Sequence, residues 1–174
     1  MNIGLLHPGD MGITISLPLQ KAGHKIYWPS KYRSQETRDK ANQHSIIDIV
    51  DLNSILKTCS VVFVICKNGG PVEVADAICS RGYDGVVCDA NNLWGEQSEK
   101  ELADKYFSAG IRYVDASLWG WPHYQSAEFS SDRTMFLYGK DSEIIKSLYI
   151  DEYWKAEILP HSAKAHKRML SEAQ

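Results

Sequence analysis

The sequence predicts an α/β fold in three layers, with a doubly wound, mainly parallel sheet of the Rossmann type. Apolar segments of strand length alternate along the chain with segments of helical periodicity, which is typical of a parallel sheet covered by helices. Residues 61–66 are apolar at every position, as in a central strand that is buried on both faces. A glycine-containing turn after residue 6 connects the first expected strand to the first expected helix.

The same patterns give the expected elements in order. Strands are expected at residues 2–6, 24–28, 61–66, 85–89, 111–115, 133–138 and 155–159. Helices are expected at residues 10–22, 31–42, 52–58, 70–81, 95–109, 141–149 and 161–173. Pro18 stands inside the first of these helices, where its ring and its missing N–H are expected to kink or shorten the helix.

Length and charge exclude several classes of protein. The 174 residues are enough for one domain with its own core. The formal net charge of −3 argues against general nucleic-acid binding, and no apolar run is long enough to span a membrane. The N-terminus lacks a basic segment followed by an apolar one, so we expect no secretory signal and a cytoplasmic location.

The cysteines and histidines do not indicate a metal site. The 4 cysteines form no C-x-x-C pair, and two of them stand inside apolar strand-like runs. This favours buried, reduced thiols over a disulfide or a metal centre. His161 and His166 would lie on different faces of a helix, so their spacing does not suit zinc.

The turn at residues 7–12 has the character of a phosphate-binding turn. The dinucleotide fingerprint needs glycines for the turn, for close approach of a pyrophosphate, and for packing of the helix on the strand. Gly9 and Gly12 occupy the middle and last of these positions, and His7 occupies the first. A phosphate there would meet unpaired backbone N–H groups and the positive end of the helix dipole.

The end of the second expected strand indicates which dinucleotide would bind. In this fold an acidic residue about 20 positions after the glycine turn binds the adenosine ribose of NAD. This chain instead carries Ser30, Lys31 and Arg33 after the strand, and these side chains suit a 2′-phosphate through charge-assisted hydrogen bonds. We therefore predict NADP rather than NAD. The alternative is that Lys31 and Arg33 are solvated residues at the start of a helix.

Further candidate residues follow the later strands. Residues 66–71 form a loop rich in glycine at the end of the third long strand, where ligands bind in such folds. Asn91 follows the next strand and would either hydrogen-bond a ligand or cap the helix at 95–109. Residues 117–124 are expected to form an aromatic-rich loop, whose two tryptophans either pack under the loop or form a pocket wall or partner surface.

These residues together resemble one family, the 3-hydroxyacid dehydrogenase and 6-phosphogluconate dehydrogenase superfamily. The similarity is greatest to a branch whose members begin I-G-L-L-H-P-G-x-M-G, as residues 3–12 do. Other motifs of that branch match at Gly23-His24, Asp89-Ala90-Asn91 and Val114-Asp115, followed by Gly120 and Pro122.

The resemblance implies an NAD(P)-dependent oxidoreductase that moves a hydride between nicotinamide and a small alcohol, carbonyl or imine. It implies a pyrophosphate site at Gly9, Asp10, Met11 and Gly12, a ribose-phosphate site at Ser30, Lys31 and Arg33, a nicotinamide site at Cys66, Lys67 and Asn91, and a substrate site at Ser117, Trp119 and Gly120. It also implies that Lys167, in the helix after the last strand, is the general acid or base. A lysine suits this task where a desolvated site lowers its pKa.

The chain departs from the family in three ways. Ser117 and Trp119 replace other residues in the substrate loop, and Ser171 replaces the asparagine that follows the lysine by four positions. Relatives also continue into a helical domain that closes the active site and usually dimerises. We therefore expect residues 1–160 to form the NAD(P)-binding domain and residues 161–174 to begin a helical domain that is absent or supplied by a partner, with a homodimer or a partner chain completing the site.

Three functions remain open at this point: an NADP-dependent oxidoreductase, an NADP-binding homologue without catalysis that acts as a sensor or accessory subunit, and an α/β domain that no longer binds the nucleotide.

Overall fold

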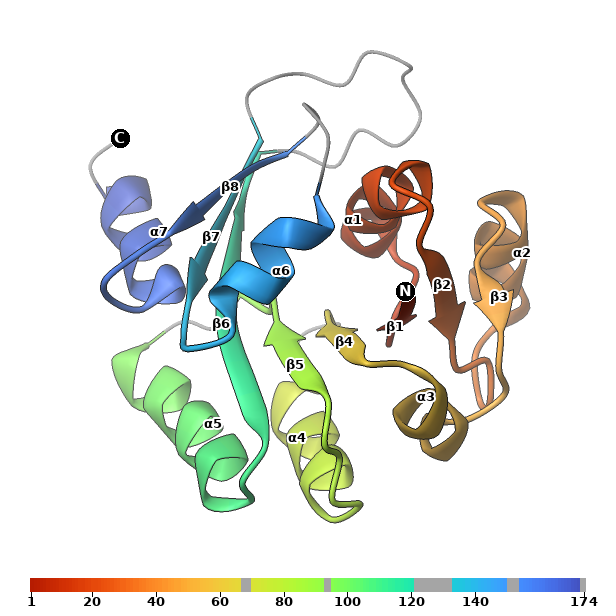
Figure 1. The fold of residues 1–174 in the computed structure, drawn as a ribbon, viewed down its shortest axis with the longest axis horizontal. Coiled ribbons are helices and arrows are strands. Elements are labelled where there is room, and N and C mark those ends of the chain that lie inside the picture. The colour runs from red at the N-terminus through yellow and green to blue at the C-terminus, as the bar shows by residue number, and fades with distance from the viewer. Residues whose placement is uncertain (67–69, 93–94, 121–132, 150–153, 173–174) are drawn as a thin grey trace.

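In the computed structural model, helices cover both faces of one twisted sheet (Figure 1). The structure describes residues 1–66, 70–92, 95–120, 133–149 and 154–172, and within these ranges the sheet has eight strands. The strands are β1 (Asn2–Leu5), β2 (Lys25–Trp28), β3 (Ile47–Asp48), β4 (Val61–Val64), β5 (Val86–Asp89), β6 (Arg112–Trp119), β7 (Thr134–Tyr138) and β8 (Lys155–Ile158). The helices are α1 (Asp10–Lys21), α2 (Gln35–Gln43), α3 (Leu52–Thr58), α4 (Pro71–Cys79), α5 (Glu96–Ser108), α6 (Ser142–Leu148) and α7 (Ala163–Glu172).

The order of the strands reverses direction at β1. The order is β3-β2-β1-β4-β5-β6-β7-β8, and every neighbouring pair is parallel except β6 and β7. From β1 the chain proceeds outward through β2 and β3, and then returns to place β4 on the other side of β1. Ligands of open α/β sheets bind at such a reversal, outside the carboxyl ends of the strands. The predicted Rossmann-type fold is confirmed.

The alternation of side chains along β4 accounts for the three layers. Val61 and Phe63 belong to the core on one face of the sheet, with residues of α1, α2 and α6. Val62 and Val64 belong to the core on the other face, with residues of α3, α4 and α5. All four side chains are buried, as a central parallel strand requires.

The structure corrects the expected elements in several places. The two-residue strand β3 was not expected, because its residues Ile47 and Asp48 are exposed and too few to form a pattern. Strand β6 continues to Trp119, so the first part of the expected aromatic loop is a strand paired with β7. The helix α2 begins at Gln35, and residues 31–34 precede it. The helix α1 is not shortened by Pro18 and continues to Lys21.

No described helix is both long and apolar enough to cross a membrane. Within the described ranges, no group of histidine, cysteine and acidic side chains is placed to hold a metal ion.

Candidate functional site

The turn between β1 and α1 leaves no room for a side chain at Gly12. A Cβ atom there would lie 2.2 Å from the backbone oxygen of His7 and 3.4 Å from Cδ1 of Leu5. Glycine therefore allows the first turn of α1 to pack directly on the end of β1. This is the helix-packing role that the last glycine of a dinucleotide turn performs.

Gly9 leaves the start of α1 without a side-chain cap. It is the N-cap residue in extended conformation, and the first hydrogen bond of the helix runs from the Ile13 N–H to its carbonyl at 2.8 Å. A Cβ atom at Gly9 would lie 3.0 Å from the His7 ring. Because residue 9 has no side-chain oxygen to accept the first N–H groups of the helix, an anion can accept them instead.

The Asp10 carboxylate at this turn is paired with a cation. Its Oδ1 atom lies 2.6 Å from Nζ of Lys40, which comes from α2. The negative charge of Asp10 is therefore offset where a phosphate would approach. Met11 is partly buried and packs against the core, so its backbone, and not its side chain, is available at the turn.

The basic segment after β2 lies next to the glycine turn. A guanidinium nitrogen of Arg33 donates to the backbone oxygen of Leu6, at the end of β1, at 3.2 Å. Lys31 and Arg33 are exposed, whereas Ser30 is buried. The Nζ atom of Lys31 lies 5.2 Å from the ring centroid of Tyr32. The structure thus brings together two segments that the sequence analysis assigned to one dinucleotide.

A cavity of about 260 Å³ at this place contains one further cation, Arg81. Lys31, Tyr32 and Arg33 line it from one side, and Arg81 reaches it from the segment after α4. Nε of Arg81 donates to Oδ1 of Asn53 at 2.5 Å. Arg81 was not predicted from the sequence, because nothing in its local pattern shows that it meets residues about fifty positions earlier.

Asn91 joins the ends of two central strands. Its Oδ1 accepts the backbone N–H of Cys66 at 2.6 Å, and its Nδ2 donates to Oδ2 of Asp89 at 3.0 Å. The amide therefore links the end of β4 to the end of β5, and it caps no helix. Burial raises the pKa of the Cys66 thiol to about 11, so this side chain is a neutral thiol at neutral pH. Lys67, predicted beside Cys66, lies outside the described residues.

Lys167 lies at the carboxyl edge of the sheet, on α7. Its Nζ donates to Oδ1 of Asn92 at 2.8 Å, three residues after the last residue of β5. Partial burial lowers the pKa of its ammonium group from the ordinary 10.5. The structure thus places Lys167 near the Asn91 end of β5, and burial shifts its pKa downward, the direction in which a desolvated site shifts a lysine.

A fully buried lysine that the sequence analysis missed lies one helical turn earlier. Nζ of Lys164 donates to Oδ1 of Asp115 at 2.5 Å and to the backbone oxygen of Asp89 at 2.9 Å, and it lies 3.2 Å from Oδ1 of Asp89. Burial by itself lowers the pKa of this ammonium, but the electrostatic effects of Tyr113, Asp89 and Asp115 outweigh burial and place the pKa well above 10.5. Lys164 is therefore charged in the folded protein.

The second oxygen of Asp115 holds the start of α7. Oδ2 accepts the Ser162 hydroxyl at 2.7 Å and the backbone N–H of Ala163 at 2.9 Å. The Ser162 hydroxyl in turn accepts the backbone N–H of Ala165 at 3.2 Å. A carboxylate at this position also interacts favourably with the helix dipole. Asp115 therefore fixes both the position of α7 and the ammonium of Lys164.

No protein-family model and no curated protein matches the sequence. Solved structures match nearly the whole chain. A conserved protein of unknown function, described as structurally similar to 3-hydroxyacid dehydrogenases, has a TM-score of 0.79 at 20% identity, over 99% of this chain and 64% of that one. An imine reductase from Bacillus cereus has a TM-score of 0.75 at 14% identity, over 98% and 59% of the two chains. A reductive aminase from Aspergillus terreus, solved with NADPH and ethyl-5-oxohexanoate, has a TM-score of 0.74 at 14% identity, over 99% and 60%.

The chain has the fold of the 3-hydroxyacid dehydrogenase-like proteins and imine reductases. The resemblance that the sequence motifs indicated is thereby confirmed at the level of the fold. This chain spans between 59% and 64% of the length of these three proteins.

The residues predicted to meet a substrate lie farther along the same edge of this dehydrogenase-like fold. Ser117 is only 1% exposed, and its hydroxyl has no hydrogen-bond partner among the described residues. Trp119 packs against the small buried cluster of Phe136, Leu159 and Ala163, the last of which is in α7. Gly120 is exposed, with φ at 114°. In the described structure Ser117 is therefore buried and Trp119 is partly buried, and Gly120 is the exposed residue of the three.

Proposed function

We propose that this chain is the NADP-binding part of an oxidoreductase that moves a hydride between the nicotinamide and a small hydroxy, carbonyl or imine substrate. One observation carries the proposal: the Arg33 guanidinium donates to Leu6, directly before the glycine turn. A helix start suited to a diphosphate and a cation suited to a ribose phosphate therefore lie next to each other, at the reversal of strand order where a dinucleotide would bind. Solved structures of the same fold include a reductive aminase with NADPH, which supports this choice of cofactor.

The donor groups on this chain fit both phosphates of such a ligand. The backbone N–H groups of Asp10 and Met11 would bind the diphosphate, because Gly9 brings no side chain to compete for the helix start. Lys31 and Arg33 would bind the 2′-phosphate, with Ser30 beside them, through charge-assisted hydrogen bonds. Arg81 would add positive charge to the lining of the same cavity.

Lys167 is the proposed acid–base residue. When bound, the reduced nicotinamide supplies the hydride. Nζ of Lys167 would then give a proton to the substrate oxygen or nitrogen. Asn92 would orient the Nζ atom of Lys167 through the 2.8 Å hydrogen bond between them. The lowered pKa of Lys167 favours release of the proton. Cys66 and Asn91 would lie on the nicotinamide side of the crevice.

A further helical domain or a second chain is proposed to complete the pocket. The described part of this chain supplies the crevice and Lys167, while the structurally similar proteins are longer by more than a third of their length. A homodimer or a partner with a helical domain would close the substrate side and exclude water from Lys167.

An alternative proposal is an NADP-binding subunit without catalysis. The observation that favours it concerns Ser171, which stands where the family has an asparagine. The Ser171 hydroxyl donates to the backbone oxygen of Lys167 at 3.0 Å and so serves the helix, not the lysine Nζ. Trp119 also packs with Phe136 under α7, where relatives use other residues to contact a substrate.

Titration with the two reduced nucleotides tests the proposal. Each nucleotide is added to the protein while tryptophan fluorescence is followed, and the 5 tryptophans provide the signal. We expect saturable binding with NADPH at least tenfold tighter than NADH. If neither nucleotide binds at millimolar concentration, both proposals fail. If NADH binds as tightly as NADPH, the assignment of Lys31 and Arg33 to a 2′-phosphate fails.

A further inference from the structure

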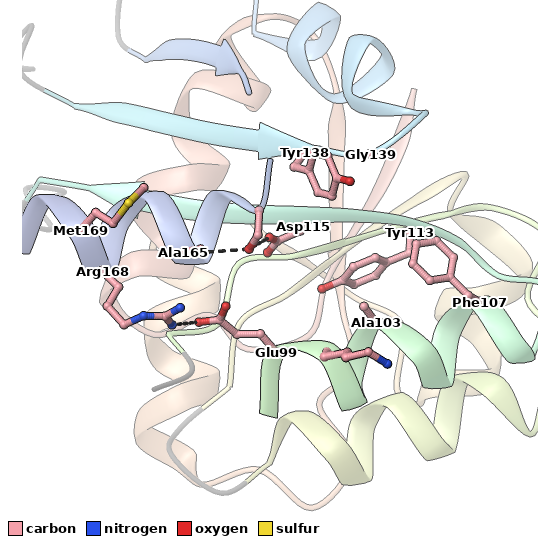
Figure 2. A pocket seen from close by; sticks show the side chains of 12 residues that line it. Glu99, Ala103, Phe107, Tyr113, Asp115, Tyr138, Gly139, Ala165, Arg168 and Met169 are labelled. Atoms are coloured by element: carbon pink, nitrogen blue, oxygen red, sulfur yellow. Dashed lines mark hydrogen bonds and ion pairs between the residues drawn. The ribbon is translucent and has the colours of Figure 1, made fainter. Parts of the chain in front are cut away.

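A pocket of about 460 Å³ lies between α5, α7 and the strands β6 and β7 (Figure 2). Ala103 and Phe107 line it from α5, Ala165 and Met169 line it from α7, and Tyr113 lines it from β6. None of the residues predicted to bind the dinucleotide is among its described lining residues. Its volume is within the range of about 300–1,000 Å³ that is usual for small-molecule sites.

The rim of the pocket is apolar and open to solvent. Phe107 is 61% exposed, Met169 is 53% exposed and Tyr138 is 43% exposed. These three belong to the three elements α5, α7 and β7, and all three line this pocket. Large apolar side chains gathered around a concave site mark a place where an apolar group binds.

One end of the pocket is aromatic. The rings of Phe107 and Tyr113 meet edge to face with centroids 5.8 Å apart, and Tyr113 stacks on Tyr106 with centroids 5.0 Å apart. Burial raises the pKa of the Tyr113 hydroxyl, so this ring is neutral across the physiological range. Figure 2 shows Tyr113 and Phe107 on one side of the pocket, and the pair formed by Glu99 and Arg168 on the other.

Each charged residue in the wall already has a partner of opposite charge. Glu99 pairs with Arg168, Lys100 pairs with Asp104, and Asp115 pairs with Lys164, which it shares with the buried Asp89. A ligand with a net charge would have to enter an apolar space without a free counter-charge, which is costly. Arg168 still has guanidinium N–H groups besides the one bound to Glu99, and these can donate to a neutral acceptor.

We propose that this pocket binds a neutral, mostly apolar small molecule about the size of two joined aromatic rings. The rings would lie against Phe107 and Tyr113. A carbonyl, hydroxyl or similar neutral acceptor would point toward Arg168. This site is separate from the dinucleotide crevice and does not depend on the proposed function.

A pair of fluorescent probes tests both parts of the proposal. N-phenyl-1-naphthylamine is neutral, and 8-anilino-1-naphthalenesulfonate has the same two ring systems with a sulfonate added. We expect the neutral probe to bind saturably with one site per chain, and the anionic probe to bind at least tenfold more weakly. Equal or tighter binding of the anionic probe overturns the neutral-ligand assignment.

Variants locate the probe. Ala165→Trp fills the pocket from α7 and is expected to remove binding of the neutral probe. Phe107→Ala truncates an exposed ring, so it tests the site without risk to folding, and it is expected to weaken binding about fivefold or more. Ser98→Phe adds a ring to the exposed face of α5 outside the pocket, and it should leave the affinity unchanged. Unchanged affinity in Phe107→Ala places the probe elsewhere and overturns the proposal.

The association state of the protein in solution tests whether the apolar rim is instead a contact between two chains. Sedimentation of the wild type and of Phe107→Ala should give the same association state. If the wild type is a dimer and Phe107→Ala dissociates it, the apolar rim is an interface between two copies of the chain and the small-molecule proposal fails.

Discussion

The indole Nε1 of Trp154 donates a hydrogen bond to the backbone oxygen of Thr14 at 3.3 Å, across 140 positions of sequence. Thr14 precedes Pro18 by four residues, so the N–H that would normally bind this oxygen is missing. Trp154 supplies the donor instead, from the segment before β8. The helix α1 can therefore continue through its proline to Lys21.

The first prediction follows from this relationship. Trp154→Phe leaves the buried Thr14 oxygen without a donor and should lower the free energy of unfolding by about 1–3 kcal/mol. In a Pro18→Ala background the new N–H can bind Thr14, so the same Trp154→Phe change should cost less. Urea unfolding of the four proteins gives the coupling between the two sites. Strictly additive effects would show that the indole bond does not compensate for the proline.

The second prediction concerns the buried ammonium of Lys164. Lys164→Met leaves the carboxylates of Asp89 and Asp115 without their cation, which should cost about 3–5 kcal/mol of stability. Adding Asp115→Asn removes one of the two charges and should restore part of the loss. Lys100→Met, which removes an exposed lysine from α5, should change the urea midpoint little. An equally small effect of Lys164→Met would mean that α7 does not depend on this ion pair.

The third prediction is a loss of stability at alkaline pH that comes from buried thiols. Burial raises the pKa of Cys59 from 9.0 to about 12. Between these two pH values the Cys59 thiol therefore stays protonated in the folded state and ionises in the unfolded state. This stabilising effect is fully present below pH 9.0 and is lost as pH rises toward 12.

Unfolding measured at pH 8 and pH 10 checks the sign and the size of this effect. Between these values the wild type should lose about 1.4 kcal/mol more stability than Cys59→Ala, because pH 10 is about one unit above the thiol pKa of the unfolded chain. Other groups that titrate in this range contribute equally to both proteins, so their contributions cancel in the difference between the wild type and Cys59→Ala. Identical losses in the two proteins would contradict a buried, protonated Cys59.

The fourth prediction separates the two nucleotides by mutation. Arg33→Ala and Lys31→Ala should each weaken NADPH binding about tenfold or more, since each removes a charge-assisted hydrogen bond, and should leave NADH binding within about twofold. Lys25→Ala removes a cation from the opposite end of β2 and serves as the control. Equal weakening of both nucleotides would indicate that these side chains support the turn without contacting a 2′-phosphate.

The fifth prediction tests Lys167. If the chain is catalytic, Lys167→Ala should abolish NADPH oxidation with small ketones and imines and change NADPH affinity by no more than about threefold, because only the transition state needs the proton transfer. Unchanged turnover would remove Lys167 from the mechanism.

A readout without turnover covers the non-catalytic alternative. The pKa of Lys167 is lowered by burial, whereas the pKa of Lys100 is raised by its hydrogen bond to Asp104. Reductive methylation followed by mass spectrometry should therefore reach its half-maximal rate at a lower pH for Lys167 than for Lys100. The reverse order would mean that the site does not prepare Lys167 for acid–base chemistry.

Much of the architecture could be read from local patterns. The apolar run at 61–66 predicted a central strand, and the side chains of β4 do alternate between the two cores. The spacing of Gly9 and Gly12 predicted the strand–turn–helix, and the contact of Gly12 with His7 shows why glycine is needed there. These features depend on neighbours within a few positions. The strand β3 was missed because two exposed residues have no periodicity.

The sequence by itself determined the layered fold, the position of the glycine turn and the basic residues after β2, because periodicity and turn chemistry are local properties of the chain. The tertiary structure alone decided which distant side chains meet. Lys164 reaches the Asp89 carbonyl across 75 positions, Arg81 shares a cavity with Arg33, and Asn91 links two strands instead of capping a helix. These contacts depend on how helices pack on the sheet, and packing follows from burial of the whole core.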